Sequence, residues 1–456
     1  MLKINNFGIH YENTTILKNL NFEVNQGELV VITGKSGCGK SSFLKAINGI
    51  ILDNEVVNLT GDIIFKNRSV LEKSISERSK FISTVFQNPK TQFFCTNTTD
   101  ELAFALENRN IERSKILDTI KKYSSMMNTE YLLDKNIFSI SGGEKQLVAI
   151  TATSCMNNDI YLFDEPSASL DKKSIELLKT MLKKLKSMGK IIIIAEHRLY
   201  YLREIADKFI IFKNKTSTLF KFNDSKKSEN ELRTLQDISK SELKDFKFRK
   251  INLLEENCVT DSDSLICKNF LVKYKKEKIL NFSISFPEGI NFIIGENGVG
   301  KSTFIKKLSG LIKGKSESLY KGKKIKKTYN FISMVMQDVN YQLFTESVWQ
   351  ELSIVNSDPC LKEKTLQELD LLDKKDFHPQ ILSGGEKQRL LIGMAKLSDK
   401  PIVILDEPTS GLCKGKMLKI IEYLHEMKEN GKTVIVVTHD YEFIKKCKGN
   451  IYEFTK

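Results

Sequence analysis

Short apolar runs recur along the chain, and the best defined of them predict buried strands. Two of these runs, Leu29 to Ile32 and Ile290 to Ile294, are each followed by a glycine-rich stretch and then by a helical pattern. Other strand-length runs end in acidic or polar residues, and they cover Ile160 to Phe163, Ile191 to Ala195 and Ile402 to Leu405. Strand, loop and helix in this order predict an α/β fold with a parallel sheet.

The apolar and polar pattern occurs twice, which predicts two copies of one domain. From a Ser-Gly-Gly-Glu motif onward the halves keep one constant offset, as three pairs illustrate: Ser141 and Ser383, Asp164 and Asp406, and His197 and His439. Insertions that distinguish the halves lie upstream, where peripheral loops are expected to vary. We predict a first domain over 1–222 and a second over 265–456, joined by a charged linker over 223–264 that acts as a tether.

Composition sets limits on this picture. The chain has 456 residues, 41% of them hydrophobic, which suits two domains. No apolar run approaches the ~20 residues that a membrane helix needs. The formal net charge is +14, but acidic residues are also spread throughout, so a solvated lysine-rich surface and attraction to an anionic membrane surface both remain open. The eight cysteines form no C-x-x-C pair and are expected to be reduced thiols.

The two glycine-rich stretches fit the pattern G-x-x-x-x-G-K-[ST] of a phosphate-binding loop. Its glycines let backbone N–H groups surround phosphate oxygens, its lysine reaches the β- and γ-phosphates, and its serine hydroxyl binds Mg²⁺. The residues expected to contact nucleotide here are Gly34, Lys35, Ser36, Gly37, Cys38, Gly39, Lys40, Ser41 and Ser42, and Gly295, Glu296, Asn297, Gly298, Val299, Gly300, Lys301, Ser302 and Thr303.

Paired carboxylates end one predicted strand in each half: Asp164 with Glu165, and Asp406 with Glu407. The carboxyl ends of parallel strands face the ligand crevice, so both pairs are expected beside the phosphate loops. We assign the aspartates to Mg²⁺ and the glutamates to polarising the attacking water. A simple turn would explain one Asp-Glu-Pro sequence, but not two at matching positions.

A glycine pair opens a helical pattern at Ser141-Gly142-Gly143-Glu144 and at Ser383-Gly384-Gly385-Glu386. The N–H groups at such a helix start favour an anion, so each motif is a second candidate phosphate site. A helix cap without a ligand is the alternative interpretation.

The ordered motifs resemble two fused nucleotide-binding domains of the ATP-binding-cassette (ABC) ATPases, each a P-loop NTPase fold with a mixed-sheet core and a helical signature subdomain. This resemblance implies ATP and Mg²⁺ as ligands. It matches the Ser-Gly-Gly-Glu segments to the cassette signature, His197 and His439 to the switch histidine at the γ-phosphate, Gln87 and Gln337 to the Q-loop glutamine near Mg²⁺, and Tyr11 and Tyr274 to the aromatic residue that stacks on adenine. Core packing remains the alternative for the two tyrosines.

In such cassettes each ATP lies between the phosphate loop of one domain and the signature of the other, so the halves are expected to act as an intramolecular dimer. The first half keeps Ser169-Leu170-Asp171 of the family's D-loop, whereas the second has Cys413 in place of the aspartate. This departure predicts that the two sites differ in rate.

A narrower resemblance follows the glutamines. Gln87 precedes Gln92-Phe93-Phe94, and Gln337 precedes Gln342-Leu343-Phe344. These segments are similar to those of the ATPases of energy-coupling-factor (ECF) transporters. The fused form, with Glu196-His197-Arg198 at the first switch, particularly resembles tandem ATPases of that group assigned to thiamine-precursor uptake. The apolar residues either form a docking groove or belong to the core.

The ECF resemblance implies a peripheral protein at the cytoplasmic face of the cell membrane. Its partners would be a transmembrane (T) subunit and a substrate-binding (S) subunit, with no nucleic acid expected. The transported substrate would be a vitamin, a vitamin precursor or a metal ion, chosen by the separate membrane protein. The alternative function is that of a soluble twin-cassette ATPase acting on ribosomes.

Overall fold

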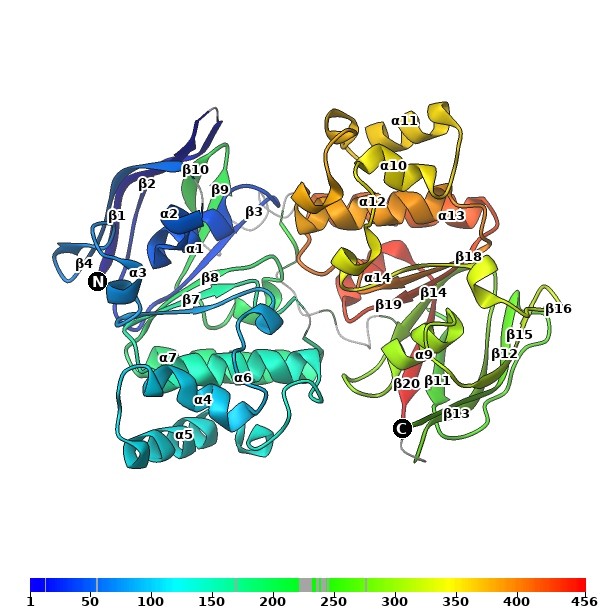
Figure 1. Cartoon of the computed structure of the whole chain (residues 1–456), viewed down its shortest axis with the longest axis horizontal. Coiled ribbons are helices and arrows are strands. Elements are labelled where there is room, and N and C mark those ends of the chain that lie inside the picture. Colours follow the sequence, from blue (N-terminus) through cyan, green and yellow to red (C-terminus); the bar gives the residue numbers. More distant parts are fainter. Residues whose placement is uncertain are drawn as a thin grey trace. The chain divides into compact units, whose positions relative to one another are not determined.

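The computed structural model describes residues 1–12, 14–54, 56–168, 170–220, 232–234, 238, 243, 246–274 and 277–456. The chain divides into two compact units, the first built on Met1–Asp237 and the second on Ile238–Leu412 and Lys416–Lys456. Each unit combines a six-stranded sheet, a four-stranded sheet and a set of helices (Figure 1). The predicted repeated α/β architecture is confirmed.

The first unit has one largely parallel and one antiparallel sheet. The six-stranded sheet has the order β10 (Thr216–Phe220), β9 (Lys208–Lys213), β3 (Leu29–Gly34), β8 (Ile191–Ala195), β7 (Ile160–Asp164) and β6 (Ile82–Val85). All its neighbours are parallel except the pair of β10 and β9. The antiparallel sheet has the order β2 (Thr14–Val24), β1 (Leu2–Tyr11), β4 (Val57–Phe65) and β5 (Arg68–Ser69).

The helices of the first unit form two groups, one that follows the phosphate loop and one that forms a helical subdomain. The helix that follows the first phosphate loop is α1 (Lys40–Asn48), and the short helices α2 (Ile50–Asn54) and α3 (Ile75–Arg78) come after it. The helices α4 (Thr98–Glu107), α5 (Arg113–Met127) and α6 (Gly142–Cys155) pack together as a helical subdomain, and α7 (Lys172–Ser187) contacts α5 and α6 (Figure 1).

The core of the first unit follows from the two-residue period of a buried strand. On β3, Leu29 and Val31 belong to the hydrophobic cluster shared with the α4–α7 helices. Val30 and Ile32 belong to a second cluster with α1 and the antiparallel sheet. Successive side chains point to opposite faces of a strand, so a continuous apolar run is required wherever both faces are covered. The strand that leads into the glycine-rich loop is therefore packed on both faces.

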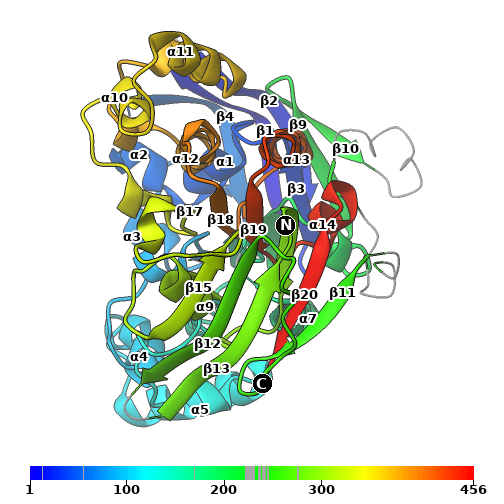
Figure 2. The same cartoon turned by 90° about the vertical axis from the view of Figure 1, so that its right-hand side faces the viewer.

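The second unit repeats this plan with a wholly parallel six-stranded sheet. Its order is β11 (Phe248–Asn252), β20 (Asn450–Thr455), β14 (Gly289–Ile294), β19 (Thr433–Val437), β18 (Ile402–Asp406) and β17 (Ile332–Val335). The antiparallel sheet has the order β13 (Glu277–Phe286), β12 (Leu265–Tyr274), β15 (Lys315–Tyr320) and β16 (Lys323–Lys324). Figure 2 shows β12 and β13 side by side.

The second unit has its own helix after the phosphate loop and a further set of helices. The helix after the second phosphate loop is α9 (Lys301–Leu308). The remaining helices are α10 (Val348–Ser353), α11 (Pro359–Glu368), α12 (Gly384–Leu397), α13 (Lys414–Glu429) and α14 (Tyr441–Cys447). Within the described ranges, no helix has both the length and the apolar content needed to cross a bilayer.

The range assigned to the linker, 223–264, contributes one strand to the second unit. Within it, β11 (Phe248–Asn252) pairs in parallel with β20 as the edge strand of the six-stranded sheet (Figure 2). Residues 223–231 of this range, like Ser169 of the first D-loop, lie outside the described residues. The boundaries of the two cassettes stay a prediction.

Candidate nucleotide sites

The first glycine-rich loop connects the end of β3 at Gly34 with the start of α1 at Lys40. Gly34, Gly37 and Gly39 have φ values of 151°, 82° and 97°, which side chains with a Cβ rarely adopt. A Cβ built on Gly37 would meet no atom within 4 Å, whereas one on Gly34 would collide with the carbonyl oxygen of Phe212. The loop thus needs glycine for its backbone, and its Gly37 side is open to a phosphate group.

Lys40 and Ser41, which end the loop, point toward the acidic strand end. Lys40 is buried, and its Nζ lies 3.0 Å from Nε2 of His197. The hydroxyl of Ser41 donates a hydrogen bond of 3.0 Å to Oδ1 of Asp164. Burial raises the pKa of Asp164, while the hydrogen bond from Ser41 acts in the opposite direction. The serine and aspartate predicted to hold Mg²⁺ are therefore adjacent.

Glu165 lies at the centre of a polar cluster. Its Oε2 accepts a hydrogen bond of 2.9 Å from Nε2 of Gln87, and its Oε1 lies 3.4 Å from Nε2 of His197. Its φ of 46° is unusual for a residue with a side chain, and its backbone N–H donates to the carbonyl of Ala195. Burial, the main cause, raises the pKa of Glu165 to about 8. A pKa this close to neutral pH suits a group that both takes up and releases a proton.

The second loop has the same backbone but a different lysine contact. Gly295, Gly298 and Gly300 have φ values of 149°, 77° and 122°, and a Cβ on Gly298 would again meet open space. Nζ of Lys301 donates to the carbonyl oxygens of Gly295 and Glu296 at 2.7 and 2.9 Å. Because the Lys301 side chain folds back onto its own loop, its ammonium group lies where phosphate oxygens are expected.

The second unit has the same pair of acidic residues at a strand end, but Glu407 has different hydrogen-bond partners from Glu165. Burial raises the pKa of Asp406 to about 6, although Ser302 hydrogen-bonds to this carboxylate. Glu407, with a φ of 51°, lies 3.7 Å from Nε2 of His439 and accepts a hydrogen bond of 3.3 Å from the hydroxyl of Thr438. The predicted catalytic pair Glu407 and His439 is brought together, as the pair Glu165 and His197 is in the first unit.

Both Ser-Gly-Gly-Glu motifs begin a helix with reciprocal caps. Ser141 and Glu144 form a capping box at α6, and Ser383 and Glu386 form one at α12. Burial alone would raise the pKa of Glu386, but hydrogen bonds from Lys374 and Ser383 lower it to about 2. A Cβ added to Gly142 or Gly384 would meet no atom within 4 Å, so both helix starts are open at the first glycine.

Of the remaining predicted contacts, Gln87 reaches the acidic cluster through its hydrogen bond to Glu165, and the two tyrosines lie elsewhere. Tyr11 ends β1 and packs, partly buried, against the core cluster that includes α1. Tyr274 ends β12, and its side chain is not among those described. Gln337 is exposed, as is Gln87. Adenine stacking by the two tyrosines stays a prediction.

Comparison with known proteins decides the family. The sequence model described as ABC transporter matches residues 17–168 and again 278–410. The chain belongs to the ABC transporter family. A protein of Treponema denticola named as an ABC transporter ATP-binding protein is 36% identical to it, with 98% of this chain and 93% of the relative covered. The chain is therefore an ATP-hydrolysing enzyme with two ABC cassettes in tandem.

Two further proteins resemble this chain, and their names describe different functions. The Bacillus subtilis protein named HMP/thiamine import ATP-binding protein YkoD is 27% identical, with 98% of this chain and 88% of the relative covered. A solved structure titled RNase-L Inhibitor has a TM-score of 0.59 and 23% identity, and covers 96% of this chain and 86% of that one. At that identity the solved structure supports the tandem fold alone.

The apolar residues after the Q-loop glutamines divide between surface and core in both cassettes. Phe94 is 75% exposed and Phe344 is 78% exposed. Phe93 instead packs against the core of the first cassette, and Leu343 is a buried core residue of the second. The core interpretation therefore holds for Leu343, whereas the partly buried Phe93 lies between core and surface.

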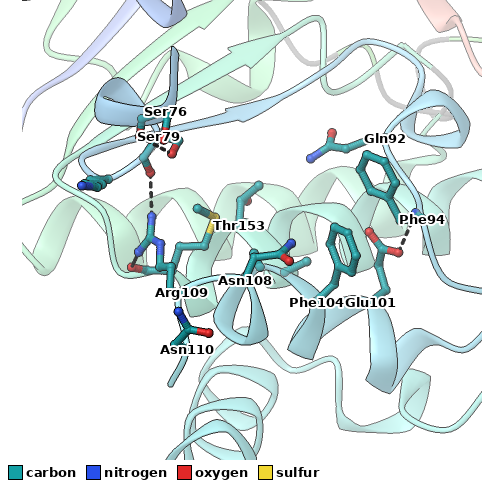
Figure 3. A pocket seen from close by; sticks show the side chains of 14 residues that line it. Ser76, Ser79, Gln92, Phe94, Glu101, Phe104, Asn108, Arg109, Asn110 and Thr153 are labelled. Atoms are coloured by element: carbon teal, nitrogen blue, oxygen red, sulfur yellow. Dashed lines mark hydrogen bonds between the residues drawn. The ribbon is translucent and has the colours of Figure 1, made fainter. Parts of the chain in front are cut away.

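A groove of about 690 Å³ borders Phe94 in the first cassette. Phe94 stacks on Phe104 of α4 with ring centroids 4.8 Å apart, and Glu101 accepts the backbone N–H of Phe94 (Figure 3). Asn108 lines the groove beside Phe104, and Arg109 lies further from the aromatic pair (Figure 3). The groove therefore offers both apolar and polar contacts.

One residue near the first site, Glu196, has no predicted role. It directly precedes His197, is 2% exposed, and accepts hydrogen bonds from both His197 and Arg198 backbone N–H groups. The second half has Thr438 at the matching position. The signal that could have identified Glu196 was this difference in charge beside a switch histidine.

Proposed function

We propose that the chain is the energy-coupling ATPase of an ECF-type importer, which closes two cassettes on ATP and drives uptake through separate membrane subunits. The observation that carries this proposal is the pair of exposed phenylalanines, Phe94 and Phe344, at matching positions after the Q-loop glutamines. Each is held by a buried glutamate, because Glu101 accepts the N–H of Phe94 and Glu351 that of Phe344. Exposed aromatic side chains on a fixed backbone favour a docking surface.

The ATP chemistry would be performed by the clusters at the two strand ends. Lys40 and Lys301 would bind the β- and γ-phosphates, and Glu165 and Glu407 would orient and deprotonate the attacking water. His197 and His439 would contact the γ-phosphate. The loop glycines Gly37 and Gly298 would admit phosphate oxygens to backbone N–H groups, since a Cβ there meets open space.

Mg²⁺ would be held by the serine, aspartate and Q-loop glutamine of each cassette: Ser41, Asp164 and Gln87 in the first, and Ser302, Asp406 and Gln337 in the second. Hydroxyl, carboxylate and amide oxygens suit this hard cation. When bound, the ion neutralises charge on the β- and γ-phosphates. The contacts between Ser41 and Asp164 and between Ser302 and Asp406 support this assignment.

The partners would be a transmembrane T subunit and a substrate-binding S subunit, with the chain bound peripherally at the cytoplasmic face of the cell membrane. The transported substrate would be a vitamin, a vitamin precursor or a metal ion. The relative named for HMP/thiamine import favours a vitamin precursor. The tether between cassettes 1–222 and 265–456 would keep each near the other.

Affinity purification of the full chain from detergent-solubilised membranes tests the proposal. Two integral membrane proteins are expected to co-purify with it. The double variant Phe94→Ser with Phe344→Ser should lose them but keep ATP binding. Leu117→Ser is the matched control, because Leu117 is 54% exposed on α5 and does not line the groove. Sedimentation with ribosomes, without membrane partners, would instead favour the ribosomal ATPase function.

A further inference from the structure

Glu196 is a buried carboxylate that accepts hydrogen bonds from four residues beside the first switch histidine. Its Oε1 accepts the backbone N–H groups of His197 at 2.7 Å and Arg198 at 3.0 Å. Its Oε2 accepts the hydroxyls of Ser167 at 2.7 Å and Tyr201 at 3.0 Å. One side chain thus connects the loop after β7, which carries Ser167, with the loop after β8, which carries the histidine.

The second cassette makes the same connection with a different residue. There Oδ2 of Asp440 accepts the hydroxyl of Thr409 at 2.8 Å, and Oδ1 accepts the backbone N–H of Phe443 at 3.1 Å. Asp440 directly follows His439, whereas Glu196 directly precedes His197. Ser167 and Thr409 occupy matching positions after their strands. The two switches are therefore fixed by carboxylates on opposite sides of the histidine.

We propose that Glu196 is the positioning residue of the first switch and holds His197 at its site. The inference rests on the proposed role of His197. The imidazole of His197 lies 3.0 Å from Nζ of Lys40 and 3.4 Å from Oε1 of Glu165, so a small backbone shift would separate it from both. A glutamine at 196 would turn an NH₂ group toward one pair of donors and leave that pair without an acceptor.

A double-mutant cycle on ATP turnover tests this role. The full chain carries Glu407→Gln throughout, so that the residual rate reports the first site. Glu196→Gln should lower kcat roughly 10- to 100-fold, because misplacing a reacting group by about 1 Å has effects of this size, with little change in nucleotide affinity. In the His197→Ala background the same substitution should lower kcat less than twofold. Glu204→Gln, at a surface carboxylate paired with Lys179, is the matched control and should leave the rate unchanged.

The histidine itself provides a readout that does not depend on turnover. The chain contains five histidines, so selective labelling of their rings gives few NMR signals, and the signal lost in His197→Ala identifies His197. This signal should shift in Glu196→Gln and in the milder Glu196→Asp, but not in Glu204→Gln. An unshifted signal in a folded Glu196 variant would overturn the inference.

The cycle also separates the two proposals. If Glu196→Gln slows turnover as strongly without His197 as with it, Glu196 acts independently of the histidine and the positioning role is wrong, while the proposed function stands. If His197→Ala leaves first-site turnover unchanged, the proposed role of the histidine fails and the inference fails with it.

Discussion

Replacing Glu165 with glutamine should stabilise the nucleotide-free first cassette while abolishing most of its turnover. Burial raises the pKa of this carboxyl from an ordinary 4.5 to about 8, so the folded state binds the proton more tightly than the unfolded state. Stability is therefore lost as the pH rises from about 4.5 to about 8 and stays low above it. Glutamine cannot ionise and escapes this loss.

The size of the effect follows from the shift of Glu165. At about 1.36 kcal/mol per pKa unit, a change from 4.5 to about 8 corresponds to at most about 5 kcal/mol above pH 8. The same substitution removes the base expected to deprotonate the attacking water, which should slow turnover at this site roughly 10²- to 10⁴-fold. A gain in stability with a loss of activity is the mark of a carboxylate held in an unfavourable environment.

Hydrogen exchange and fluorescence distinguish the two cassettes in the assay. Amide exchange on β7 and β8, measured from pH 6 to pH 9 and corrected for the intrinsic rate, reports the opening of the first cassette. As the pH rises, the amides of Glu165→Gln should become increasingly more protected from exchange than those of the wild type. Trp349, the single tryptophan of the chain, lies on α10 of the second cassette, and its unfolding transition should not change. Equal protection of both proteins across this pH range would refute the burial argument for Glu165.

Three further predictions concern the paired sites. Lys40→Ala and Lys301→Ala should each weaken ATP binding at one site by about 1.5–3 kcal/mol, through loss of a charge-assisted contact, and calorimetric titration should resolve one weakened site in each. Because Cys413 replaces the D-loop aspartate, we expect the site built on Lys40 to hydrolyse ATP more slowly than the site built on Lys301. Glu407→Gln should therefore lower total ATPase activity more than Glu165→Gln does, and Cys413→Asp should narrow this difference. Equal ATPase rates in the two glutamine variants would contradict the prediction. Since the pKa of Asp406 is raised to about 6, Mg²⁺-dependent nucleotide binding at the second site should weaken as the pH falls below about 6, as fluorescent-nucleotide titrations at pH 5.5 and 7.5 can test.

Motif spacing was sufficient to predict which residues of the candidate sites lie together, because it combines local and topological constraints. The loops at Gly34 and Gly295 each connect a buried strand to a helix, as expected. Asp164 meets Ser41, and Glu165 meets His197, because neighbouring parallel strands end at the same edge of the sheet.

The sequence was less informative where one apolar pattern is compatible with two different local structures. Adjacent apolar residues such as Phe93 and Phe94 give no indication which of them faces the core, since that depends on the register of the chain against α4 and α6. The strand at Phe248–Asn252 contains two basic residues and sits at a sheet edge, where alternation with burial is weak. Its pairing with β20 arises from tertiary contact and not from local preference.

The same limit explains why the two switch histidines looked equivalent. A motif comparison aligns Glu196 with Thr438 and Arg198 with Asp440, as if two unrelated substitutions had occurred. In the structure the substitutions compensate each other, because the carboxylate lost after the histidine is supplied by the residue before it. Changing Glu196 alone to threonine would leave the hydroxyls of Ser167 and Tyr201 without that acceptor. The loop around each histidine is therefore a unit of several side chains, and its two versions in one chain are alternative ways of holding an imidazole beside a buried glutamate.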